Sequence, residues 1–548
     1  MANNNAGVPP TEPVLQIDQF SVSLPSGADR QFAIEDISLQ VAPREILCIV
    51  GESGSGKSVT AHGIMGLLPT GQLEPVGGTI HLLGESLLDA TSGRLQQLRG
   101  SCMSMIFQEP MTALNPVMTL GRQIEEVLAE HTRISTRERM ERTLNLMESV
   151  NLPDPPNLYR TYPHQISGGQ RQRVMIAMAL ALEPALLIAD EPTTALDVTT
   201  QAQILTLISN IQREHNTGVL FITHDFGVVA EIADRVAVMK DGKIVETGPT
   251  KHVLGAPKDA YTRMLIPAVP SFTPRRIPSG ATKPIVLATD TLSKTYHTKS
   301  FFGRRRTVAA VQKVTIKIRQ GETLGVVGES GAGKSTVARC VARLIEPTNG
   351  QIYMHNENLA KLSISQFRPW RKRIQIVFQD PYRSLNPRRT IGDAIAEGPK
   401  NFGATSKKAY ERTSELLDLV GIDPTAADRY PHQFSGGQRQ RVCIARALAM
   451  EPELLVADEP VSALDVSVQA QVLNLLTDIQ ARFNLAILFI THDLRVAAQI
   501  SDHIAVMYQG EIVEQGPASH VFANPTHDYT KRLFNAAPGR SWDFSNSL

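Results

Sequence analysis

The sequence predicts two consecutive α/β domains, each built on a parallel sheet with helices packed around it. Two observations predict this fold class. Short apolar runs alternate with stretches whose apolar residues recur at helical spacing, which is the pattern of alternating strands and helices. The same series of motifs also occurs twice along the 548 residues. A chain of this length is too long for a single hydrophobic core.

The first motif is a glycine-rich loop between a predicted strand and a predicted helix. Residues 45–50 form an apolar run, and the eight residues 51–58 that follow fit the pattern G-x-x-x-x-G-K-[ST]. Strand, loop and helix in this order are typical of a phosphate-binding loop, whose backbone N–H groups converge on phosphate oxygens. The lysine then reaches the outer phosphates and the serine hydroxyl binds magnesium. The residues of this predicted site are Gly51, Ser53, Gly54, Gly56, Lys57, Ser58 and Val59.

A second loop of the same pattern, residues 328–335, follows a second apolar run at residues 323–327. The chain therefore has two predicted nucleotide sites. The residues of the second site are Gly328, Ser330, Gly331, Gly333, Lys334, Ser335 and Thr336.

Four shorter motifs follow the loop in the same order in both halves. They are an aromatic residue followed by Gln, a Ser-Gly-Gly-Gln segment, an apolar strand that ends in Asp-Glu, and the triplet Thr-His-Asp. The separation is 268 residues from Ser167 to Ser435 (435 − 167) and 277 residues from Lys57 to Lys334 (334 − 57). This spacing is of domain size, so it indicates a duplicated domain and not a solenoid.

Together these motifs resemble the nucleotide-binding domain of ATP-binding-cassette (ABC) proteins, and the resemblance covers nearly the whole chain, twice. It implies two P-loop NTPase domains, each a parallel-sheet core with an antiparallel β subdomain and a helical subdomain. It also implies ATP and Mg²⁺ as ligands of both loops. The family's signature usually begins with Leu, whereas Ile166 and Phe434 stand here, which exchanges one apolar residue for another.

Acidic residues at the ends of two apolar strands predict the metal site and the catalytic group. Asp190 and Asp458 are placed to hold magnesium across from the serine of the loop. Glu191 and Glu459 follow them and suit a general base, or a group that polarises the attacking water. The alternative for each glutamate is a charge at the start of a helix.

The family resemblance assigns roles to one histidine and one glutamine in each half. His224 and His492 end apolar strands, and they would contact the terminal phosphate and hold the water and the glutamate in line. A core or capping histidine is the alternative. Gln108 and Gln379 would sense magnesium and water, or else they are polar strand ends.

The Ser-Gly-Gly-Gln segment precedes a helical run in each half and forms a second kind of anion site. Serine is a good N-cap, and the residues after it expose N–H groups at the positive end of a helix. In the family, this segment of one domain and the glycine loop of the other enclose one ATP. The resemblance thus implies an intramolecular head-to-tail sandwich, which a short linker favours. The residues concerned are Ser167, Gly168, Gly169, Gln170, Ser435, Gly436, Gly437 and Gln438.

The two halves differ at the aromatic residue that the family stacks on adenine. Tyr296 fits this position in the second half, whereas Leu24 stands at the equivalent place in the first. The first site therefore lacks the predicted stacking, which allows a weaker nucleotide affinity there.

Motifs and composition set the expected domain boundaries. We expect residues 13–266 and 286–537 to form the two nucleotide-binding domains, between a disordered N-terminus (residues 1–12) and a C-terminal tail (residues 538–548). Residues 267–285 are rich in proline and predict an extended, semi-rigid linker.

Composition and hydropathy narrow the classes of function. Apolar residues make up 42% and charged residues 20%, which is ordinary for a globular protein, and a net charge of +1 gives no strong field to recruit nucleic acid. The longest apolar run, residues 174–182, is too short to cross a bilayer. Any membrane role must then come through a partner. The polar N-terminus does not resemble a signal peptide.

Three classes of tandem ABC protein compete: an importer ATPase, a soluble ATPase acting on ribosomes or DNA, and an exporter ATPase. Ribosome-type proteins carry a long, charged, helical linker, whereas the linker here is short and rich in proline. The DNA-repair type has clustered zinc-binding cysteines and exporters usually fuse membrane helices, and this sequence shows neither feature. Several shorter motifs resemble those of the dipeptide, oligopeptide and nickel importers. They are Phe-Gln-Glu/Asp-Pro, Leu-Asn-Pro and Tyr-Pro-His-Gln, together with the segments 257–262 and 525–530. The chain resembles the fused version, as in glutathione and microcin-C-type peptide uptake.

The four cysteines, Cys48, Cys102, Cys340 and Cys443, form no C-x-x-C pair, and they fit small buried side chains in a reducing compartment. Some ATPases of the peptide subfamily bind an iron–sulfur cluster, which needs about four thiolates. Residues 257–284 and 525–548 contain no cysteine, so we expect no such cluster.

This resemblance implies specific partners. They are two transmembrane permease subunits, with one copy of the chain per permease pair, and through them a periplasmic or extracellular solute-binding protein. Nucleic acid is not expected as a partner. The location implied is the cytoplasmic face of the bacterial inner membrane. We expect permease grooves beside residues 111–114 and 382–385, with Leu114 and Leu385 at the rim.

Overall fold

The computed structural model describes residues 12–194, 196–275, 283–299, 305–462, 464–540, Trp542 and Phe544. Nearly all of the predicted N-terminal segment, linker residues 276–282 and most of the tail after residue 540 lie outside this description. The chain divides into two compact units. The first comprises Met1–Leu196, Thr200–Pro267 and Pro538–Leu548, and the second comprises Asp197–Thr199 and Ala268–Ala537.

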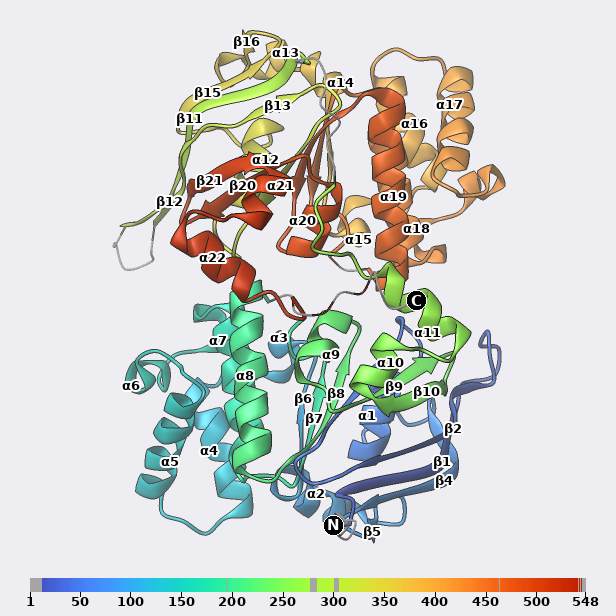
Figure 1. The fold of residues 1–548 in the computed structure, drawn as a ribbon, viewed down its shortest axis with the longest axis vertical. Helices are drawn as coiled ribbons and strands as arrows, with labels where there is room; N and C mark the ends of the chain where they lie inside the picture. Colours follow the sequence, from blue (N-terminus) through green and yellow to red (C-terminus); the bar gives the residue numbers. More distant parts are fainter. Residues whose placement is uncertain are drawn as a thin grey trace, which may run out of the picture. The chain divides into compact units, whose positions relative to one another are not determined.

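The first unit contains two sheets (Figure 1). One is six-stranded, in the order β10 (Lys243–Pro249), β9 (Arg235–Lys240), β3 (Ile46–Val50), β8 (Gly218–Thr223), β7 (Leu186–Asp190) and β6 (Met103–Ile106). Its pairs are parallel except for β10 with β9. The other is four-stranded and antiparallel, in the order β2 (Phe32–Val41), β1 (Leu15–Ser23), β4 (Glu74–Leu82) and β5 (Glu85–Ser86).

The helices of the first unit fall into two groups. One group accompanies the sheets: α1 (Lys57–Met65), α2 (Ser92–Ser101), α8 (Val198–Glu214), α9 (Phe226–Ile232), α10 (Thr250–Gly255) and α11 (Ala260–Ala268). The other belongs to the helical subdomain, which Figure 1 shows beside α8: α3 (Pro110–Ala113), α4 (Leu120–His131), α5 (Thr136–Ser149), α6 (Pro155–Leu158), η1 (Pro163–Gln165) and α7 (Gly168–Leu180).

The second unit repeats both sheets. Its six-stranded sheet has the order β17 (Ile374–Val377), β18 (Leu454–Asp458), β19 (Ala486–Ile490), β14 (Thr323–Val327), β20 (His503–Tyr508) and β21 (Glu511–Pro517). Its antiparallel sheet contains β12 (Arg305–Val314), β11 (Ile285–Lys299), β15 (Asn349–Met354) and β16 (Glu357–Asn358), and β13 (Lys317–Arg319) also pairs with β11.

The helices of the second unit follow the same plan. They are α12 (Lys334–Val341), η2 (Leu359–Lys361), α13 (Ile364–Phe367), α14 (Trp370–Arg373), α15 (Pro381–Ser384), α16 (Ile391–Asn401), α17 (Ser406–Leu419), η3 (Pro424–Asp428), η4 (Pro431–Gln433), α18 (Gly436–Leu448), α19 (Val466–Phe483), α20 (Leu494–Ile500), α21 (Ala518–Ala523) and α22 (Asp528–Asn535). The predicted α/β class, with its antiparallel and helical subdomains, is confirmed in both units.

Burial explains why the central strands form a parallel sheet. Every residue of β3, β7 and β8 is buried, and a strand covered on both faces is apolar throughout instead of alternating. The register pairs Val50 with Thr223 and Asp190 with Ile222. The glycine loop after β3 and the polar ends of β7 and β8 therefore lie at one edge of the sheet.

An ion pair beside the central strand has a different cation in each unit. In the first unit, Arg235 Nη1 lies 3.0 Å from Glu45 Oε1, and in the second, His503 Nδ1 lies 2.6 Å from Glu322 Oε1. The contact with Glu322 raises the pKa of His503 above 6.5, although partial burial opposes the charged form. Because arginine stays charged throughout the ordinary pH range, the pair in the second unit titrates and the pair in the first does not.

We expect the wild-type protein to lose stability relative to a His503→Arg variant as the pH rises. A raised histidine pKa stabilises the folded state fully below the unfolded value of 6.5, and this contribution is lost as the pH rises through the folded-state pKa. Urea unfolding at about pH 6 and about pH 9 measures the effect as a difference in midpoint. Glu322→Gln should remove this pH-dependent difference, because the histidine then has no carboxylate partner. If the urea midpoint changes equally between the two pH values in the wild type and in His503→Arg, the prediction is wrong.

Candidate functional site

The lysine of each glycine loop is buried and bound by its own loop. Lys57 Nζ donates to the carbonyl oxygens of Gly51 and Glu52 at 2.8 and 2.9 Å. Lys334 makes the same two contacts in the second unit at 2.7 and 2.8 Å, and burial lowers its pKa. The backbone therefore wraps around an ammonium group, and the loop curves as a phosphate-binding loop must.

The last glycine of each loop is required by both conformation and space. Gly56 has φ 107°, and a Cβ atom there would lie 2.9 Å from the carbonyl oxygen of Ala33. Gly333 has φ 103°, and its Cβ would lie 2.2 Å from the oxygen of Ala310. Glycine adopts this left-handed conformation without a steric penalty, so the loop can approach the antiparallel sheet and then begin α1 or α12.

The structure brings the predicted metal ligands together. Ser58 Oγ donates to Asp190 Oδ1 at 3.1 Å, and Ser335 Oγ donates to Asp458 Oδ1 at 2.8 Å. Burial raises the pKa of both aspartates, although the serine hydrogen bonds act in the opposite direction. A hydroxyl and a carboxylate side by side are oxygen donors of the kind that Mg²⁺ prefers, so these residues fit the predicted ion.

The predicted glutamine, glutamate and histidine also meet, at the ends of three neighbouring strands. In the first unit, Gln108 Nε2 donates to Glu191 Oε2 at 3.0 Å, and His224 Nδ1 lies 3.2 Å from Glu191 Oε1. The second unit repeats this arrangement: Gln379 Nε2 donates to a Glu459 oxygen at 2.9 Å, and His492 Nδ1 lies 3.2 Å from the same atom. Each glutamate therefore contacts both a glutamine and a histidine, through separate oxygens in the first unit and through one oxygen in the second.

The backbone and charge of this glutamate are unusual. Glu191 and Glu459 have φ values of 47° and 50°, in the left-handed region. Burial alone would raise the pKa of Glu191, but His224 and Thr194 outweigh burial and hold the pKa at about 2. The pKa of Glu459 is also lowered. Both side chains are therefore ionised at neutral pH and can accept a hydrogen bond from water.

The Ser-Gly-Gly-Gln segment forms a reciprocal cap at the start of α7 and α18. Ser167 Oγ accepts the N–H of Gln170 at 3.3 Å, and Gln170 Oε1 accepts the N–H of Ser167 at 3.0 Å. Ser435 and Gln438 form the same pair at the same distances. The predicted N-cap role of serine is thus present, and the glutamine side chain completes the cap. A nucleotide contact by Gln170 or Gln438 stays a prediction.

The two glycines of this segment differ in how much space their surroundings leave for a side chain. A Cβ on Gly437 would lie 2.2 Å from Val468 Cγ1 on α19, and one on Gly169 would lie 2.7 Å from Thr200 Cγ2 on α8. A Cβ on Gly436, by contrast, would find its nearest neighbour at 3.9 Å. The second glycine therefore allows two helices to approach closely, which sequence reasoning had not predicted.

Four further predicted positions have different outcomes. Tyr296 on β11 is 38% exposed, whereas Leu24 packs against the core of the first unit, so the two halves differ as expected and an adenine contact by Tyr296 stays a prediction. The placement of Leu114 and Leu385 at an exposed rim was wrong, because they are only 2% and 3% exposed.

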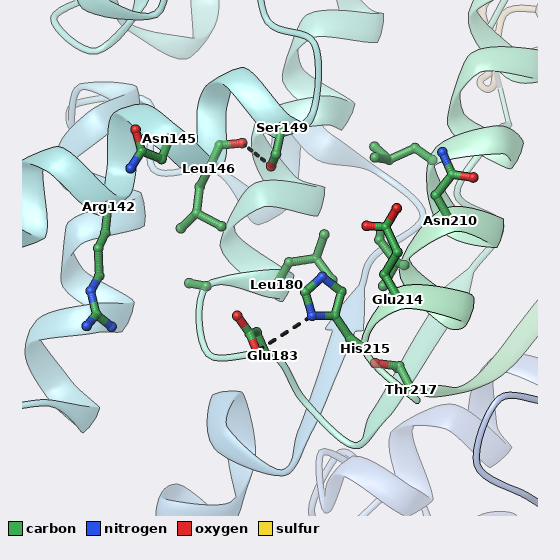
Figure 2. A pocket seen from close by; sticks show the side chains of 13 residues that line it. Arg142, Asn145, Leu146, Ser149, Leu180, Glu183, Asn210, Glu214, His215 and Thr217 are labelled. Atoms are coloured by element: carbon green, nitrogen blue, oxygen red, sulfur yellow. Dashed lines mark hydrogen bonds and ion pairs between the residues drawn. The ribbon is translucent and has the colours of Figure 1, made fainter.

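A cavity of about 670 Å³ lies in the first unit between α5, the end of α7 and α8 (Figure 2). Leu146, Leu180 and Ile211 contribute apolar surface, and the side chains of His215 and Glu183 meet at 3.6 Å. None of the predicted site residues lines this cavity. The cavity is therefore separate from the site described above.

Comparisons with known proteins match two family models. The model described as ABC transporter matches residues 34–194 and 311–462, and the oligopeptide/dipeptide transporter, C-terminal region, matches residues 245–310 and 513–541. The peptidoglycan transport ATP-binding protein YejF of Agrobacterium fabrum is 48% identical and covers 96% of this chain and 97% of its own. The glutathione import ATP-binding protein GsiA of Escherichia coli K12 is 46% identical, with 96% and 89% covered. A solved dimeric ATP-binding cassette, MJ0796 with ADP and Pi, is 28% identical over 43% of this chain and 98% of its own, at a TM-score of 0.39.

We expect Gly437→Ala to destabilise the second unit, because the added methyl group would overlap Val468. Overpacking of this kind costs about 1–3 kcal/mol, measurable as a lower midpoint of thermal unfolding. The matched control is Gly436→Ala, which has room for its methyl group and should not lower the midpoint. Adding Val468→Ala to Gly437→Ala should recover part of the loss; no recovery would mean that the overlap is not the cause.

Proposed function

The chain belongs to the ATP-binding proteins of ABC transporters that carry the oligopeptide/dipeptide C-terminal region, and we propose that it powers import of peptides or peptide-like solutes through separate permease subunits. One observation carries the proposal. In each unit, a buried lysine, a serine–aspartate pair and a glutamate in contact with a glutamine and a histidine gather at one edge of the parallel sheet. This set of groups suits hydrolysis of a nucleoside triphosphate.

Each side chain of the first site has a proposed role. Lys57 binds the outer phosphates, and the N–H groups of the loop surround them. Glu191 orients the attacking water, while His224 contacts the terminal phosphate and keeps the carboxylate in place. Ser58, Asp190 and Gln108 would hold Mg²⁺, which supplies positive charge to the phosphate oxygens when bound. Ser335, Asp458 and Gln379 would do the same at the second site.

Both sites are proposed to be composite. The Ser-Gly-Gly segment of each half would complete the ATP site of the other half, as in the family's head-to-tail sandwich. The helix starts at Gly168 and Gly436 support this, because each presents N–H groups at the positive end of a helix of 13 residues. Both halves retain every charged group of the site, so two competent sites are proposed.

The proposed partners follow from the family. The curated relatives are named for peptidoglycan transport and glutathione import, which supports peptide-like solutes for this chain and gives no support to a ribosome or DNA ATPase. None of the helices in the described part of the chain has the length and apolar character needed to cross a bilayer. From the family and the named relatives, we propose two permease subunits per chain, a solute-binding protein beyond them, and a location at the cytoplasmic face of the bacterial inner membrane.

Two exposed apolar side chains at equivalent positions support permease docking. Met111 on α3 and Tyr382 on α15 are 53% and 65% exposed, each two residues after the acidic residue of its Phe-Gln-Glu/Asp-Pro motif. Each lies close in sequence to the glutamine that contacts the catalytic glutamate. A permease helix seated there would sense the state of the ATP site through a short segment of chain.

We expect Glu191→Gln and Glu459→Gln each to slow ATP hydrolysis and to leave ATP binding intact. A glutamine keeps the shape of the side chain but loses the charge that orients the water, so the double variant should be slower by about a hundredfold or more. Single-turnover hydrolysis measures the rate, and Glu183→Gln, on an exposed glutamate of the separate cavity, is the control. If one single variant keeps the wild-type rate per molecule, the proposal of two competent sites is wrong.

We expect Met111→Glu combined with Tyr382→Glu to weaken co-purification with the permeases while ATP binding stays normal, because a charge replaces apolar contact area. Val76→Glu places the same charge at a similarly exposed apolar residue of the first unit and is the control. Full co-purification and peptide uptake by the double variant would rule out this docking surface. Sedimentation of the wild type with ribosomes, and never with membranes, would rule out the importer.

A further inference from the structure

The C-terminal region of each unit contains a tyrosine that the proposed chemistry does not use. Tyr261 is the second residue of α11 and Tyr529 the second residue of α22, and both lie in the segments matched by the oligopeptide/dipeptide C-terminal model. They are only 6% and 3% exposed. A buried tyrosine usually has a partner for its hydroxyl group, and here the partner is the glycine loop.

The hydroxyl group contacts the second residue of the glycine loop in both units. The N–H of Glu52 donates to Tyr261 Oη at 3.3 Å, and the Tyr261 hydroxyl donates to Glu52 Oε2 at 3.1 Å. In the second unit, the N–H of Glu329 donates to Tyr529 Oη at 3.1 Å. We propose that these two tyrosines are positioning residues that hold the start of each glycine loop in the shape that binds ATP.

The surroundings of the two rings differ, although the hydroxyl contact is the same. Lys240 Nζ lies 5.0 Å from the centroid of the Tyr261 ring, whereas at the equivalent place Tyr508 stacks on Tyr529 with centroids 4.1 Å apart. The tyrosine ring therefore packs against a different side chain in each unit, whereas the contact of its hydroxyl group with the glycine loop is present in both.

A carboxylate on the neighbouring strand fixes the turn that carries the tyrosine. Glu246 on β10 accepts the N–H groups of Lys258 and Asp259 at 2.9 and 3.1 Å, and Asp259 Oδ1 accepts the N–H of Tyr261 at 2.8 Å. In the second unit, Glu514 accepts two N–H groups of the equivalent turn at 2.8 and 3.0 Å, and His527 Nδ1 accepts the N–H of Tyr529 at 3.1 Å. In both halves of the chain, hydrogen bonds thus connect the strand to the turn and the turn to the tyrosine.

The consequence for the loop is that one residue is held at both of its backbone polar groups. The N–H of Glu52 is bound by Tyr261 and its carbonyl oxygen by Lys57, at 2.9 Å. Glu329 is held in the same way by Tyr529 and Lys334, the latter at 2.8 Å. A loop fixed in advance loses less entropy when it binds phosphate, so the tyrosine should affect ATP affinity and not the hydrolytic step.

The test is the double variant Tyr261→Phe, Tyr529→Phe, which removes both hydroxyl groups and keeps both rings. The first site loses the two hydrogen bonds between Tyr261 and Glu52, and the second loses the one between Tyr529 and Glu329. These losses should weaken ATP binding by about two- to tenfold. The kcat at saturating ATP should stay near the wild-type value, and hydrogen exchange in residues 51–56 should become faster. Tyr508→Phe, the same chemical change on the ring that stacks against Tyr529, is the control and should bind ATP as the wild type does.

The outcomes separate this inference from the proposed function on which it rests. Unchanged ATP affinity and unchanged hydrogen exchange in the double variant would overturn the inference. A loss of ATP affinity accompanied by a lower kcat and a lower midpoint of thermal unfolding would also overturn it, because that combination indicates a merely structural role. The proposed function is tested separately by Lys57→Ala with Lys334→Ala. If those variants bind ATP normally, the loops are not the nucleotide sites at all.

Discussion

The parallel register of the central strands is the constraint on which both sites depend. The buried strands β3, β7 and β8 end at one edge of their sheet, with Val50 opposite Thr223 and Asp190 opposite Ile222. That register sets the serine of the loop against its aspartate and places the next residue, Glu191, between the glutamine after β6 and the histidine after β8. The proposed catalytic groups are therefore held in place by the core of the domain itself.

The sequence was most informative where a residue's place depends on local pattern. The apolar run 323–327 is the strand β14, and the serine before each Gly-Gly pair caps a helix as predicted. It was less informative where contacts link distant segments. Leu114 and Leu385 follow short helices, and nothing local shows that the remaining fold covers them. The contact of Tyr261 with Glu52 joins residues 209 positions apart, for which periodicity and spacing carry no signal.

The duplication acts as an internal comparison. The hydrogen bonds among the proposed site residues have the same partners in the two units, at distances equal to within a few tenths of an ångström. Supporting contacts vary: the second unit has His503 in place of Arg235 beside the equivalent glutamate, and Tyr508 in place of Lys240 beside the equivalent tyrosine. A supporting side chain can therefore be exchanged for another type of residue, provided that the new residue also contacts the same glutamate or tyrosine position.

The left-handed backbone of Glu191 and Glu459 has a consequence for how such repeats evolve. Asparagine and glycine tolerate this conformation better than glutamate, which costs roughly 1 kcal/mol or more there. Either replacement would relieve this backbone strain in a half-site that no longer had to hydrolyse ATP, and selection for hydrolysis would no longer oppose the change. The residue at this one position is therefore an inexpensive indicator, across fused proteins of this kind, of which half has kept its activity and which has become a passive binding partner.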